Sequence, residues 1–189
     1  MVVSTSNKTK NALSEALKDL TNKTPFAKIS IGNICEKCNI CRKSFYYHFK
    51  DKYDLVYWIF QTELVQKIQI RTYETSWDLL EDICIYLYDN RKFYVNVFQA
   101  NGQNSFREIF SEILHPIISN KVESTITYRN HNKQQFYTQF ITDAYLLSIE
   151  RWLMAKIPMN PIEYINHFRM EKEELKASPI LRGYKSLYY

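Results

Sequence analysis

Glycine and proline are scarce in this chain, with three and five copies among 189 residues. An all-β protein needs many tight turns, and these two residues supply most of them. Leu, Ile, Glu, Lys and Gln recur instead in long uninterrupted segments, and hydrophobic residues make up 46% of the chain. We therefore predict an all-α protein of about nine helices, with a small domain attached to a larger one.

Long apolar runs are also missing. The chain contains no stretch of about 18 apolar residues, and residues 1–10 lack the apolar core of a signal peptide. Three of the four cysteines, Cys35, Cys38 and Cys41, crowd into seven residues, and the fourth is Cys84. A disulfide framework would be spread more widely, so reduced thiols and a cytoplasmic protein without a membrane partner are expected.

Positive charge is concentrated at the N-terminal end. Residues 1–52 contain ten Lys or Arg against four Asp or Glu, whereas the remaining residues contain fifteen against sixteen. All of the excess of +5 therefore lies in the first segment. This asymmetry favours an N-terminal domain that binds the phosphates of a nucleic acid, joined to a C-terminal part that does not. We expect a DNA-binding domain at residues 1–52 and a C-terminal dimerisation and effector domain at residues 53–189.

The segment from Ile29 to Lys52 has the pattern of a helix-turn-helix. Ser30 is suited to cap a helix that runs to about Cys38, and Asn39 readily adopts the left-handed conformation that a sharp turn needs. A short second helix is expected from Arg42 to Phe49. Asp51 is then a candidate N-cap for a long helix.

Other helices are predicted from apolar spacing and from helix-breaking residues. They are residues 11–20, 77–87, 93–100, 105–128 with Pro116 inside, 134–156 and 160–176. In the segment 134–156, Phe136, Phe140, Ala144 and Leu147 share one face. Asn160 and Pro161 have the order of an N-cap and a first helical residue.

Residues 29–55, and especially the run FYYHFKDKYDL at 45–55, resemble the DNA-binding domain of TetR/AcrR-type transcriptional regulators. The runs NRKFY at 90–94 and SFREIF at 105–110, with Trp152, resemble the subgroup of dihydroxyacetone kinase regulators. The family resemblance implies a homodimer in which the last two main helices, here 134–156 and 160–176, form a four-helix interface between subunits.

The chain departs from the family pattern at four positions. Asn39 stands where the family usually has glycine, and Cys35 and Cys38 stand where it has small alanines. Cys41 stands where Ser or Thr usually caps the recognition helix. Loss of such a cap typically costs about 1 kcal/mol, and a phosphate contact would be lost with it.

The predicted DNA contacts lie mainly on the second helix of the motif. Arg42, Lys43, Ser44 and Tyr47 are placed to reach base edges and nearby phosphates. The resemblance assigns phosphate contacts to Tyr46 and Lys52, and Ser30 offers its amide or hydroxyl at a helix N-terminus. Cys41, at the start of the recognition helix, completes the predicted DNA-binding set. The alternative for this surface is a solvated basic face.

His48 and the clustered cysteines could also be interpreted as metal or catalytic sites. His48 lies between Tyr47 and Phe49 without partner ligands nearby, so a structural role is favoured over metal binding or catalysis. The three clustered cysteines superficially suggest a zinc or iron–sulfur site, but Cys35 and Cys38 occupy positions of small buried residues. Cys41, beside Arg42 at a helix N-terminus, is the candidate for oxidative control.

No Ser-His-Asp set, glycine-rich phosphate loop or metal-binding histidine pair occurs, so neither an enzyme nor a cofactor is expected. Aromatic residues with polar tips line either a small-molecule cavity or simply the core of the C-terminal part. They are Tyr57, Trp58, Trp77, Tyr86, Tyr88, Tyr94 and Trp152.

We therefore predict a homodimeric regulator that binds a palindromic operator in double-stranded DNA and is released by a small-molecule effector. One alternative is an activator or coactivator of the dihydroxyacetone kinase regulator type, controlled by a protein partner. Another is a ligand-binding or enzymatic helical protein whose basic N-terminus is incidental.

Overall fold

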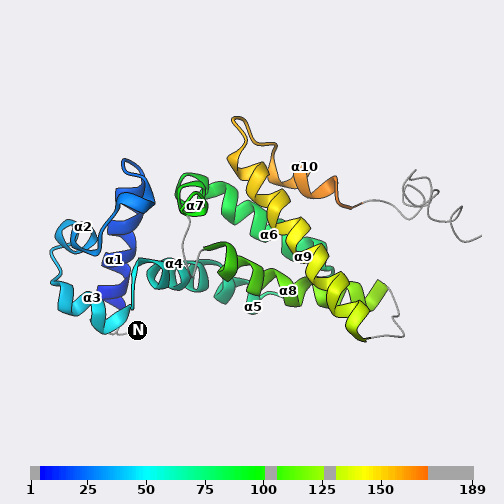
Figure 1. Ribbon diagram of the computed structural model, residues 1–189, viewed down its shortest axis with the longest axis horizontal. Helices are drawn as coiled ribbons and strands as arrows, with labels where there is room; N and C mark the ends of the chain where they lie inside the picture. The colour runs from blue at the N-terminus through cyan, green and yellow to red at the C-terminus, as the bar shows by residue number, and fades with distance from the viewer. Residues whose placement is uncertain (1–4, 101–105, 126–130, 170–189) are drawn as a thin grey trace, which may run out of the picture.

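The computed structural model describes residues 5–100, 106–125 and 131–169, and all the regular secondary structure in these ranges is helical. Figure 1 shows the first three helices gathered at one end, with α4 leading from them toward the remaining helices. If residues 52–69 are counted as one helix, these ranges contain nine helices. The prediction of an all-α fold is confirmed.

The N-terminal helices pack around a small core. They are α1 (Thr5–Thr21), a 3-10 turn η1 (Phe26–Lys28), α2 (Ile31–Lys37) and α3 (Arg42–His48). Leu13 and Leu17 of α1, Phe26, Ile34 of α2 and Phe45 of α3 are all fully buried. Each helix thus contributes its apolar face to one shared interior.

Local side-chain chemistry sets the ends of these helices as predicted. The Ser30 hydroxyl accepts a hydrogen bond from the Asn33 amide at 3.1 Å, and the Asn33 side chain accepts one from the Ser30 amide at 2.9 Å. Asn39 has a φ of 54°, which places it in the left-handed region that the turn requires. Asp51 caps the next helix by accepting from the amides of Tyr53 and Asp54 at 2.7 and 2.9 Å.

The long helix that follows is interrupted by a π-helical segment. It consists of α4 (Lys52–Phe60), the π segment η2 (Gln61–Val65) and α5 (Gln66–Gln69). Leu55, Ile59 and Leu64 are buried in the core. A π segment inside an α-helix is uncommon and often marks a functional position. Its Glu63 hydrogen-bonds to Lys18 and Tyr86.

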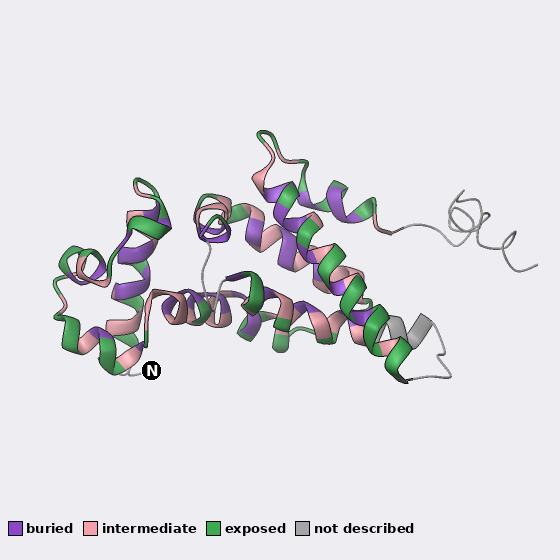
Figure 2. Cartoon of the chain, viewed as in Figure 1, coloured by how far each residue is buried: buried purple, intermediate pink, exposed green. Residues whose placement is uncertain are grey.

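The C-terminal helices enclose an aromatic cluster. These helices are α6 (Ser76–Asp89), α7 (Arg91–Phe98), α8 (Phe106–Thr125) and α9 (His131–Met154). The Phe106 ring lies 5.2 Å from Phe60, 4.9 Å from Tyr94 and 4.8 Å from Phe98. The contacts of Phe106 with Phe60 and Phe98 are edge-to-face, which adds to the stabilisation from burial. Purple, buried segments line the inner faces of these helices in Figure 2.

The last predicted helix is much shorter than expected. α10 spans Pro161–Asn166, with Asn160 as its N-cap, instead of running to residue 176. Phe168 leaves the helix to pack 5.1 Å from Tyr145, and Arg169 pairs with Asp78 and Glu81 of α6 at 2.9 and 2.8 Å. These contacts draw the chain onto α6 and end the helix. The rest of the predicted segment, residues 170–176, lies outside the described residues.

Candidate nucleic-acid interface

Helix α3 is anchored through one face only. Phe45 is fully buried and Phe49, which follows the helix, is 3% exposed. Their rings lie 5.8 Å apart, and Phe49 also contacts Trp58 of α4 at 5.9 Å. This aromatic base fixes the orientation of α3 and turns its other face outward.

The outward face of α3 is cationic and aromatic. Tyr47 is 83% exposed and Tyr46 is 58% exposed, although aromatic side chains are usually buried. Arg42 and Lys43 are exposed beside them, Ser44 is half-buried, and α3 contains no acidic residue. A short helix that presents cations and exposed phenols is suited to phosphates and base edges.

Arg42 rests on the neighbouring helix of the motif. A Cβ atom at Gly32 of α2 would lie 2.5 Å from Nη2 of Arg42, so the missing side chain at Gly32 leaves room for the guanidinium. The sequence pattern did not identify Gly32 as important, because its role depends on a contact between two helices. The contact with Gly32 therefore sets the position of the Arg42 guanidinium beside α2.

Of the other residues predicted to contact DNA, Ser30 is already hydrogen-bonded within the protein and Cys41 is not. The Ser30 hydroxyl is engaged with Asn33 within its capping box, at 2.6 Å from Oδ1. Cys41 is exposed and stands at the N-cap of α3, but its side chain makes no capping hydrogen bond. The start of α3 therefore lacks the side-chain cap that a hydroxyl would provide.

Lys52 is engaged inside the protein. Its ammonium donates to the carbonyl oxygens of Phe26, Ala27 and Ile29 at 2.7, 3.3 and 2.8 Å. It also lies 4.6 Å from the centre of the Phe26 ring. Desolvation by burial lowers the pKa of the Lys52 ammonium below its ordinary value. This geometry ties α4 to the segment that precedes α2, a role that the sequence did not reveal.

The two cysteines before the turn and His48 pack within the motif. Cys35 is buried, and the half-buried Cys38 thiol donates to the Ile34 carbonyl at 3.1 Å. Burial raises the pKa of both thiols. His48 is half-buried with its ring 4.9 Å from that of Tyr47. Within the ranges that the structure describes, no group of three His, Cys, Asp or Glu residues could hold a metal ion.

The aromatic residues predicted to line either a cavity or the core differ in how far they are buried. Tyr94 and Trp152 are buried, Trp58, Trp77, Tyr86 and Tyr88 are half-buried, and Tyr57 is 40% exposed. The rings of Tyr88 and Trp152 stack at 5.9 Å. Buried rings in mutual contact are core residues. No helix in the described part of the chain is long and apolar enough to cross a membrane.

The C-terminal part matches a family model described as the transcriptional regulator C-terminal region, over residues 74–170. The chain is also 26% identical over 113 residues to the HTH-type dhaKLM operon transcriptional activator DhaS of Lactococcus lactis. That match covers 58% of this chain and 60% of the relative, so it spans less than two thirds of the relative's length.

Two solved structures show the same fold. A TetR transcriptional regulator from Streptococcus agalactiae superposes with a TM-score of 0.63 and 18% identity, covering 86% of this chain and 92% of that one. The dihydroxyacetone kinase operon activator DhaS superposes with a TM-score of 0.57 and 20% identity, covering 77% and 84%.

Proposed function

The chain belongs to the TetR family of transcriptional regulators, and we propose that it binds a palindromic operator as a homodimer through α3. The observation that carries this proposal is the outward face of α3. Its cations and its Tyr46 and Tyr47 are exposed to solvent, while Phe45 and Phe49 anchor the helix beneath them. Exposed side chains on a rigid base are what recognition of base edges requires.

The residues divide by role in this proposal. Arg42, Lys43, Ser44 and Tyr47 contact base edges and adjacent phosphates, and Tyr46 contacts a phosphate. Cys41 and Ser30 lie at the helix starts that face the DNA backbone. Lys52 positions the motif through its three carbonyl contacts, and the phosphate contact implied by the family resemblance stays a prediction. The boundary between the DNA-binding and C-terminal domains falls at Lys52.

Dimerisation is proposed to use the exposed face of α9. Phe136 is 72% exposed, Phe140 57% and Leu147 45%, and they recur along one side of the helix. Apolar patches of this size on a helix mark a protein interface. As the family resemblance implies, α10 is the second helix that we assign to the interface, and its Ile162 is 49% exposed.

Control by a small-molecule effector is the form of regulation that we propose. In it, a ligand changes the separation of the two α3 helices, which must match successive major grooves about 34 Å apart. The second candidate is an activator controlled by a protein partner. It is favoured by the similarity to the activator of the dhaKLM operon.

A footprinting experiment tests the proposed function. Genomic fragments retained by the protein are sequenced, and the protected bases are mapped. Protection of two inverted half-sites by a species with the mass of a dimer supports the proposal. Protection of a single half-site, or retention of every fragment alike, contradicts it. Repeating the assay with a metabolite panel and then with a cell lysate separates the two forms of regulation.

A further inference from the structure

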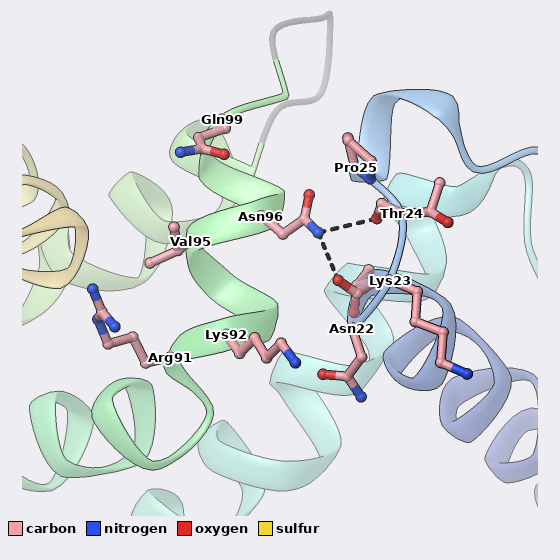
Figure 3. Close-up of a pocket in the computed structure, with 10 residues that line it drawn as sticks. Asn22, Lys23, Thr24, Pro25, Arg91, Lys92, Val95, Asn96 and Gln99 are labelled. Carbon is pink, nitrogen blue, oxygen red and sulfur yellow. Dashed lines mark hydrogen bonds between the residues drawn. The ribbon is translucent and has the colours of Figure 1, made fainter. Parts of the chain in front are cut away.

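An open groove lies between the loop that follows α1 and the helix α7. It has a volume of about 500 Å³, within the range of small-molecule sites. Figure 3 shows its two walls, with the loop from Asn22 to Pro25 on one side and α7 on the other. Apart from two threonines, the polar side chains that line it are Asn22, Lys23, Arg91, Lys92, Asn96 and Gln99.

Asn96 holds the two walls together. Its Oδ1 accepts from the amide of Phe26 at 2.7 Å, and its Nδ2 donates to the carbonyls of Thr21 and Thr24 at 2.8 and 3.1 Å. One side chain of α7 thus satisfies three backbone groups within and at the two ends of the loop. The groove is formed by both parts of the protein, and these hydrogen bonds join its two walls.

The lining is positively charged and contains no carboxylate. Arg91 is engaged, since it donates to the carbonyls of Leu153 and Ala155 at 2.6 Å each. The side-chain ammonium groups of Lys23 and Lys92 make no ion pair or hydrogen bond with the described residues. The Lys92 side chain extends toward Asn22 across the groove (Figure 3). Cations without counter-charges beside free amides favour an anionic oxygen ligand.

We propose that this groove binds a small metabolite anion that carries carboxylate or phosphate groups. Lys92 and the Asn22 amide hold the anion directly, and Lys23 adds to the positive potential. DNA does not compete for this site, because α3 lies at the opposite end of α1 in Figure 1.

A ligand here touches both the loop after α1 and α7. Its binding therefore stabilises one arrangement of the DNA-binding helices relative to the C-terminal helices. The effect of the ligand on the DNA-binding helices rests on the proposed function, whereas anion binding at the groove does not. Anion binding measured without DNA therefore tests the site independently of the proposed function.

Isothermal titration of the intact protein with inorganic phosphate and, separately, with citrate tests the site, with sodium chloride used to hold ionic strength constant. The matched variants are Lys92→Ala and Lys67→Ala, because Lys67 is an exposed lysine of α5 outside the groove. We expect saturable binding of at least one anion, retained in Lys67→Ala and weakened roughly tenfold or more in Lys92→Ala.

The anion that binds more tightly identifies the ligand class. Two results would overturn the proposal: no saturable binding of either anion by the natural protein, or equal affinities in the two variants. Neither result depends on whether the protein binds an operator.

Discussion

The Lys18 ammonium of α1 donates to both carboxylate oxygens of Glu63 in the π segment, at 2.6 Å to Oε2. Glu63 Oε2 also accepts from the Tyr86 hydroxyl at 2.9 Å, and this hydroxyl lies 2.7 Å from that of Tyr94. A polar chain thus runs from the first helix to the buried centre of the C-terminal part. Burial raises the pKa of both phenols, so they stay protonated and keep this chain intact.

The ion pair between Lys18 and Glu63 is expected to stabilise the protein. Both side chains are partly shielded from water, at 22% and 29% exposure. Lys18→Met should lower the free energy of unfolding by about 1 kcal/mol. Urea unfolding of Lys18→Met, Glu63→Gln and the double variant measures the coupling between them. If the two single effects simply add in the double variant, the pair contributes nothing specific.

Stability should fall at alkaline pH because buried acidic groups resist ionisation. Burial raises the pKa of Tyr145 from 10.0 to about 12. The unfolded chain ionises this phenol first, so the stabilisation is complete below pH 10 and is lost as the pH rises toward 12. Tyr145→Phe should therefore lose less stability than the natural protein over this window. Chemical unfolding at pH 8, 10 and 11 makes the comparison, and parallel losses in the two proteins would show that Tyr145 does not contribute.

Restoring a hydroxyl at the start of α3 should stabilise the motif. Cys41 has an extended N-cap conformation but makes no side-chain capping bond. Cys41→Ser supplies an acceptor for the exposed amides and should add about 1 kcal/mol. Thermal unfolding under reducing conditions measures the gain, with Cys41→Ala as the control that lacks an acceptor. Equal midpoints for the serine and alanine variants would argue against the cap.

The Cys41→Ser variant also tests oxidative control. Peroxide treatment should leave its DNA binding unchanged. If the natural protein is equally insensitive to peroxide, the redox hypothesis for Cys41 is wrong.

Lys52→Met should reduce stability by about 2 kcal/mol, since three carbonyl groups lose a charged donor. Lys43→Ala is the control, because Lys43 is exposed and its loss should change stability by less than about 0.5 kcal/mol. Urea unfolding compares them. A Lys52→Met protein of natural stability that binds all DNA more weakly would instead support the phosphate contact implied by family resemblance.

Local signals made much of the fold predictable. Ser30, Asn39 and Asp51 each act through backbone groups within three residues of themselves, and each does what its residue type predicts. The apolar face of α9 was also read correctly from its spacing, because Phe136 and Phe140 are exposed together.

Long-range contacts were not predictable in this way. The end of α10 depends on Phe168 and Arg169 meeting α6, and the role of Asn96 depends on a loop about 70 positions earlier. The hydrogen bonds from Lys52 to carbonyl groups more than twenty positions earlier are also long-range contacts. No periodic pattern encodes such contacts, since they arise only after the helices have packed.

The central claim is that the exposed face of α3 reads DNA, and Tyr47→Ala tests it most directly. Tyr47 is 83% exposed, so its loss should leave the unfolding midpoint almost unchanged. Fluorescence anisotropy with the footprinted operator and with random DNA, each at several salt concentrations, is the measurement. We predict that Tyr47→Ala weakens operator binding at least about tenfold, narrowing the gap between operator and random DNA. Unchanged operator affinity in a folded Tyr47→Ala protein would contradict the account.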